Sequence, residues 1–181
     1  SMRNYREPLN WAQATKRFAA ELETVGGHLP ELLKQELAFP YREGSQFAQW
    51  AFLAKGWSGV NALFADPPIS SAQILHPEKY YIRRFTPLRI TPFGLKRQFM
   101  ENAVLDETLG EFRIQMLLGS NQPREEARLI AAGWTGDHLS AYPDGEGLIT
   151  AWISAWSGDK EARAHLKRLV QNPLGLRYPL V

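Results

Sequence analysis

Six residues in short, motif-like phrases have the side chains that a binding or catalytic site needs. A histidine beside carboxylates can transfer protons, and tryptophan rings can line a ligand groove. None of the six has a certain local structural role, so we expect a ligand site, if the chain has one, where they converge. The six residues are His76, Glu78, Tyr80, Glu111, Trp134 and Asp137.

Local structure offers a simpler role for three of these residues. Glu111 is a candidate general acid or base, but it follows Thr108 by three residues, which is the spacing of a helix capping box and favours a structural role. Asp137 lies in the phrase Gly133-Trp134-Thr135-Gly136-Asp137, where it is placed to bond backbone amides. Trp134 is expected to be a core residue beside a tight turn, and Trp57 beside Gly56 is expected to be buried in the same way.

The sequence predicts no metal, no cofactor and no catalytic residue. The chain has no cysteine, and its four histidines are far apart with no His-Glu-x-x-His motif. Ser70 and Ser71 are better explained as a helix cap than as nucleophiles. The histidines are His28, His76, His138 and His165.

One stretch could attract a polyanion. Residues 79–97 contain six basic and no acidic residues, with aromatic rings between them. That mixture suits nucleic acid, but the net charge of the chain is only +2, so we expect a solvated face and no nucleic-acid partner.

The elements that must position these residues indicate an α+β fold. With 181 residues, 44% hydrophobic and 22% charged, the chain is predicted to form a single globular domain without a transmembrane segment or a signal peptide. A helical part covers about 8–76, and its successive helices are expected to end at Pro40 and near Gly56. A sheet-containing part covers about 87–171, with the change between Pro77 and Pro87.

The second half is predicted to be a small antiparallel sheet packed with helices. Alternating residues predict a short strand at 88–90 and another at 96–105, and a helix follows Thr108. Residues 138–142 and 147–156 flank Pro143-Asp144-Gly145-Glu146, which is typical of a β-hairpin. The chain is expected to turn extended at His76-Pro77.

Several phrases, taken in order, resemble the C-terminal region of poorly characterised bacterial proteins related to zincin-like metallopeptidases. The resemblance covers roughly residues 36–165. The phrases are Phe39-Pro40-Tyr41, Gly56-Trp57, Pro67-Pro68-Ile69-Ser70, His76-Pro77-Glu78-Lys79-Tyr80, Leu109-Gly110-Glu111, Gly133-Trp134-x-Gly136-Asp137 and Trp152-x-x-x-Trp156.

In that family the zinc-binding His-Glu-x-x-His helix lies N-terminal to these phrases, and this chain lacks it. The resemblance therefore implies a non-catalytic structural or binding module that accompanies an upstream peptidase-like region, and no catalytic residue is carried over. By the same analogy the protein could be exported. Ser1-Met2 looks like a tag scar, and the sequence leaves open whether the natural chain extends upstream. The alternative is a fragment of a zinc metallopeptidase or another hydrolase.

Overall fold

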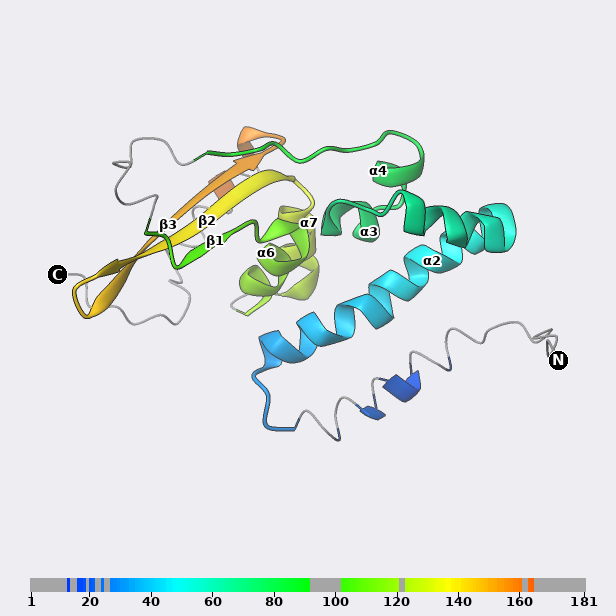
Figure 1. Ribbon diagram of the computed structural model, residues 1–181, viewed down its shortest axis with the longest axis horizontal. Coiled ribbons are helices and arrows are strands. Elements are labelled where there is room, and N and C mark those ends of the chain that lie inside the picture. Colours follow the sequence, from blue (N-terminus) through cyan, green and yellow to red (C-terminus); the bar gives the residue numbers. More distant parts are fainter. Residues whose placement is uncertain are drawn as a thin grey trace. The chain divides into compact units, whose positions relative to one another are not determined.

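The computed structural model divides into two compact units, Ser1–Pro68 and Ile69–Val181 (Figure 1). It describes residues 13, 16–18, 20–21, 24, 27–91, 102–120, 123–160 and 163–164. The chain is α+β, with helices in its first half and then a three-stranded antiparallel sheet with helices. The division at Pro68 comes before the predicted change from the helical to the sheet-containing part, which was placed between Pro77 and Pro87. The single-domain organisation stays a prediction.

The first unit is dominated by helix α2, Glu31–Ala65. The helix continues through Pro40, so the predicted stop at that residue is wrong. A proline removes one helical hydrogen bond, at a cost of about 3 kcal/mol, but it does not prevent the next residues from continuing the helix. Helical spacing after Pro40 buries Phe47 and Ala51 on one face.

The predicted break near Gly56 is present as a sharp kink inside α2. Lys55 and Gly56 have non-helical dihedral angles, and the positive φ of Gly56, 60°, suits a residue without Cβ. Beyond the kink, a Cβ at Gly59 would lie 2.3 Å from the Ala51 carbonyl oxygen, so the two segments pack backbone to backbone. The prediction that Trp57 is buried is wrong, because its side chain is 55% exposed.

The helices with described bounds in the second unit lie before and between its strands. They are α3 (Ser71–Leu75), α4 (Glu78–Tyr81), α6 (Gly110–Gly119) and α7 (Arg124–Ala131). His76 breaks the helix before Pro77, as expected of a residue that precedes proline. The chain then makes one turn of helix in α4, so the expected extended conformation after Pro77 begins only beyond that helix.

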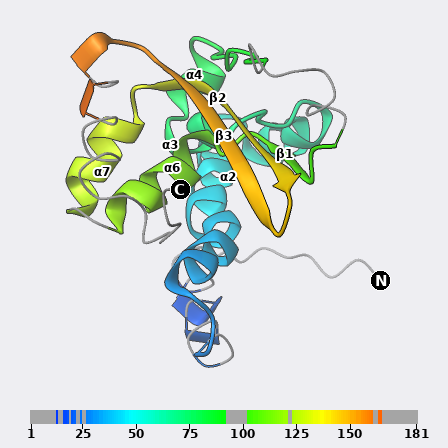
Figure 2. The ribbon, with the colours of Figure 1, turned by 90° about the vertical axis from the view of Figure 1, so that its left-hand side faces the viewer.

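The second unit also contains a sheet in the order β1–β2–β3, formed by β1 (Leu105–Glu107), β2 (Trp134–Asp144) and β3 (Gly147–Trp156). The long β2–β3 hairpin, which is prominent in Figure 2, confirms the prediction. Gly145 supplies the positive φ of 59° that its tight turn needs.

The predicted strand at 88–90 does not form. The Leu88 backbone N–H donates to the Thr135 carbonyl at 2.8 Å, but residues 88–90 form no β-ladder with β2. This segment crosses β2 at Gly136, where a Cβ would lie 2.4 Å from the Leu88 carbonyl oxygen.

The core of the second unit lies between the sheet and helices α3, α6 and α7. Figure 1 shows α6 and α7 beside the hairpin, with the segment that follows α4 passing on its other side. The buried residues of this core cluster are Ala72, Ile114, Leu118, Ala127, Ile130, Ala131 and Trp134, with Phe85, Leu109, Trp152 and Trp156 packed against them.

Some predicted elements fall on residues outside the described ranges. They are most of the N-terminal helix around 11–25, the residues 96–101 of the predicted second strand, and most of the last helix with the tail after Pro173.

Gly136 provides a test of the close crossing over β2. We expect Gly136→Ala to lower the free energy of unfolding by about 1–3 kcal/mol, because the added Cβ must displace the Leu88 backbone. Gly147→Ala is the matched control, since its Cβ would meet nothing nearer than 3.6 Å. Chemical denaturation measures both, and equal unfolding free energies for the two variants would contradict the crossing.

Candidate functional site

Glu111 is a buried carboxylate held by a histidine and a lysine side chain. It lies in the first turn of α6 and is only 2% exposed. His76, which follows α3, approaches it with Nε2 2.5 Å from Oε1, and Lys79 of α4 donates to Oε2 at 3.3 Å. Because an ionised carboxylate only accepts, the His76 Nε2–H is the donor. Both oxygens of Glu111 are therefore engaged.

The second ring nitrogen of His76 also faces a carboxylate. Nδ1 lies 3.8 Å from Oε1 of Glu78, whose side chain is 60% exposed. His76 thus lies between a buried and an exposed carboxylate.

Tyr80 does not join this cluster. The Arg84 guanidinium lies over its ring at 4.7 Å, and the ring of Tyr81 meets it edge to face at 4.7 Å. Burial, with the neighbouring Tyr80 as a second cause, raises the pKa of Tyr81 above its usual value of 10.0. These contacts make Tyr80 part of an aromatic and cationic surface beside the site.

The predicted capping box at Thr108 and Glu111 is wrong. The Thr108 hydroxyl donates to the Asp137 carbonyl at 3.2 Å, and Glu111 turns toward His76 and Lys79. The start of α6 is instead capped from distant parts of the chain: the Phe112 N–H donates to the Ser71 hydroxyl at 3.1 Å, and Asp137 accepts the two N–H groups described next.

Asp137 accepts four hydrogen bonds while only 2% exposed. The backbone N–H groups of Leu109 and Gly110 donate to it at 2.9 and 3.0 Å, which confirms the prediction that it bonds backbone amides. The indole N–H groups of Trp134 and Trp152 donate at 2.9 and 3.1 Å. Asp137 thereby joins α6, β2 and β3 at a single carboxylate.

Gly110 is the residue at which both carboxylates meet the start of α6, because its N–H donates to Asp137 and Glu111 follows it in the chain. Its φ is +75°, and a Cβ there would lie 2.9 Å from the Ser71 hydroxyl. Only a glycine fits both demands easily.

The six residues proposed from the sequence thus form two clusters with Tyr80 apart from both. His76, Glu78 and Glu111 meet in one cluster, while Trp134 and Asp137 meet in the other. Sequence reasoning missed Lys79, Ser71 and Trp152 as partners; Lys79 lies inside the phrase that contains His76, which was the available signal.

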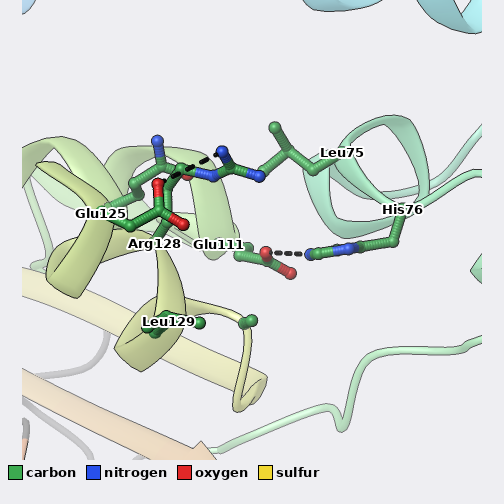
Figure 3. A pocket seen from close by; sticks show the side chains of 8 residues that line it. Leu75, His76, Glu111, Glu125, Arg128 and Leu129 are labelled. Atoms are coloured by element: carbon green, nitrogen blue, oxygen red, sulfur yellow. Dashed lines mark hydrogen bonds and ion pairs between the residues drawn. The ribbon is translucent and has the colours of Figure 1, made fainter.

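The first cluster borders a small pocket of about 100 Å³ (Figure 3). His76 and Glu111 point toward each other on one side, and the exposed pair Glu125–Arg128 of α7, 3.6 Å apart, stands on the other. Leu75 and Leu129 form an apolar part of the pocket wall. We call this the His76 pocket.

In the described part of the chain, no group of three or more histidine, aspartate and glutamate side chains could hold a metal ion. The helices described there include none with the length and apolar character needed to cross a membrane. The basic stretch is divided among separate roles: Lys79 pairs with Glu111, and Arg84 covers Tyr80.

Residues 97–172, less than half of the chain, match a family described as a domain of unknown function (DUF8575). The matched range includes Glu111 and Asp137 but not His76 or Lys79, so it contains the buried carboxylates without the histidine and the lysine that hold Glu111. No curated protein and no solved structure matches the chain.

Asp137→Asn tests the four-donor carboxylate. An amide keeps the shape but replaces one acceptor oxygen with a donor that faces N–H groups, so we expect a loss of about 2–4 kcal/mol in the free energy of unfolding. Asp144→Asn, at the exposed end of β2, is the control and should change it little. Equal effects in thermal or chemical unfolding would contradict the assigned role.

Proposed function

We propose that this chain is a non-catalytic binding module of a bacterial protein related to zincin-like metallopeptidases. The observation that carries the proposal is the pairing of Glu111 with His76 and Lys79. The relation to peptidases rests on the sequence phrases described above.

This pairing disfavours Glu111 and His76 as general acids or bases. A general base needs an accessible lone pair within reach of a substrate proton. Glu111 has both oxygens engaged, and the two ring nitrogens of His76 face Glu111 and Glu78. Within the described residues, no hydroxyl hydrogen-bonds to either ring nitrogen of His76, so the arrangement differs from that of an activated nucleophile.

The size of the His76 pocket favours binding of a single chemical group. Sites for whole small molecules usually measure about 300–1,000 Å³. A space of about 100 Å³ admits one side chain or one chain end of a partner. The Glu125–Arg128 pair at its edge can exchange its mutual contact for contacts with a charged group of either sign.

A partner polypeptide is therefore the occupant that we propose, and the upstream peptidase-like region is the candidate implied by the resemblance. Such a contact would place one charged or polar side chain of the partner between α7 and the His76–Glu111 pair.

A second candidate is a hydrolase fragment, because a histidine between two carboxylates does border a pocket. In that case Glu111 would take part in turnover, and its replacement would abolish activity. The two candidates differ in what the purified chain binds and hydrolyses.

The test measures bound zinc by elemental analysis and hydrolysis of a fluorogenic peptide library, for the wild type, Glu111→Gln and Glu125→Gln. We expect substoichiometric zinc and no hydrolysis above the buffer blank in all three. Glu125 is the matched control because it lines the same pocket but is exposed.

Stoichiometric zinc that a chelator removes would overturn the proposal. Hydrolysis that Glu111→Gln abolishes and Glu125→Gln preserves would overturn it as well, and would support the hydrolase alternative.

A further inference from the structure

A second pocket lies where the segment after α4 crosses the sheet, and its residues are separate from the His76 pocket. Its volume is about 340 Å³, within the range of small-molecule sites. Polar side chains predominate among the residues that line it. They include Arg89, Thr91, Asp106, Thr108, His138 and Tyr142.

We propose that this Arg89 pocket binds the oxyanion group, carboxylate or phosphate, of a small organic ligand. The argument begins with its charges. Four side chains that line it bear or can bear a charge: Arg89, Asp106, Asp137 and His138. Two of these, the aspartates, are already balanced within the fold.

Asp137 is balanced by its four N–H donors, from Leu109, Gly110, Trp134 and Trp152. Asp106 of β1 is balanced by His138 of β2, whose Nε2 lies 3.4 Å from Oδ1. Both aspartates thus have partners other than Arg89 among the described residues.

Arg89 makes no hydrogen bond and no ion pair with the described residues, and it is exposed at the pocket. Its planar guanidinium offers a fork of donors that matches the two oxygens of a carboxylate or a phosphate. An exposed, unpaired arginine can turn toward such a ligand without giving up an existing partner.

The floor of the pocket supplies further polar groups. Side chains alternate between the faces of a strand, so His138, Ser140 and Tyr142 of β2 project from one face of the sheet. Ser140 does not line the pocket, but it lies between two residues that do, and it is 1% exposed. Its hydroxyl has no hydrogen-bond partner in the described part of the chain, which is an unusual state for a buried polar group.

The side chains thus provide a cationic fork at the opening, an imidazole ring on the sheet and the Thr91 hydroxyl beside them. This combination is suited to an oxyanion joined to a polar body of a few atoms. The stretch around Arg89, taken from the sequence alone as a candidate polyanion face, contributes one exposed cation at the pocket here instead of a continuous basic surface.

The experiment follows backbone amide resonances of the isotope-labelled full chain during separate titrations with inorganic phosphate and with acetate at constant ionic strength. We expect saturable shifts of the Thr108 and His138 amides with at least one anion, and the anion that binds identifies which oxyanion the site takes. Arg89→Gln should weaken binding about tenfold, since a charge-assisted hydrogen bond is lost, and His138→Gln should weaken it through the loss of the ring.

Arg83→Gln is the matched control, because Arg83 is an exposed cation of the same segment that does not line the pocket. It should bind as the wild type does, and circular dichroism checks that all three variants are folded. The proposal is overturned if neither anion produces saturable shifts at these amides. It is equally overturned if Arg89→Gln or His138→Gln binds as tightly as the wild type, or if Arg83→Gln weakens binding to the same extent.

Discussion

Two buried carboxylates at the start of α6 set the constraint on which the second unit depends. An unpaired charge in a protein interior costs several kcal/mol, so each carboxylate must be met by donors from other elements. Asp137 collects N–H groups from the α6 terminus, β2 and β3, and Glu111 collects His76 and Lys79 from the α3–α4 region. Asp137 thus fixes α6 to the sheet, and Glu111 fixes α6 to the α3–α4 region.

The parts of the fold that depend on neighbouring residues could be predicted from the sequence. The β2–β3 hairpin follows from alternating side chains around a Gly-containing turn, and both signals lie within a few residues. The predicted helix end at Pro40 was wrong, because a helix tolerates one missing hydrogen bond when the residues beyond it still pack. The segment at 88–90 has the alternation of a strand, but a ladder needs a partner edge, and the pattern carries no information about whether one is available.

The candidate site shows the same division between local and distant effects. The sequence predicted that Asp137 bonds backbone amides. It could not identify these amides, because they belong to Gly110 and Leu109, which lie 27 and 28 residues earlier in the chain. The capping box failed because its two side chains have other partners: the Thr108 hydroxyl donates to the Asp137 carbonyl, and Glu111 pairs with His76 and Lys79. His76 lies 35 residues from Glu111, and that separation gives no pattern that spacing arguments can detect.

The most direct test of this account is the coupling free energy between His76 and Glu111, measured by chemical denaturation of His76→Ala, Glu111→Ala and the double variant. If the buried pair stabilises the fold, the coupling should be about 1–3 kcal/mol. The same cycle for Glu125 and Arg128, an exposed pair at the same pocket, should give no more than about 0.5 kcal/mol. Additive effects of the His76 and Glu111 substitutions would contradict the claim that their pairing is a structural element of the module.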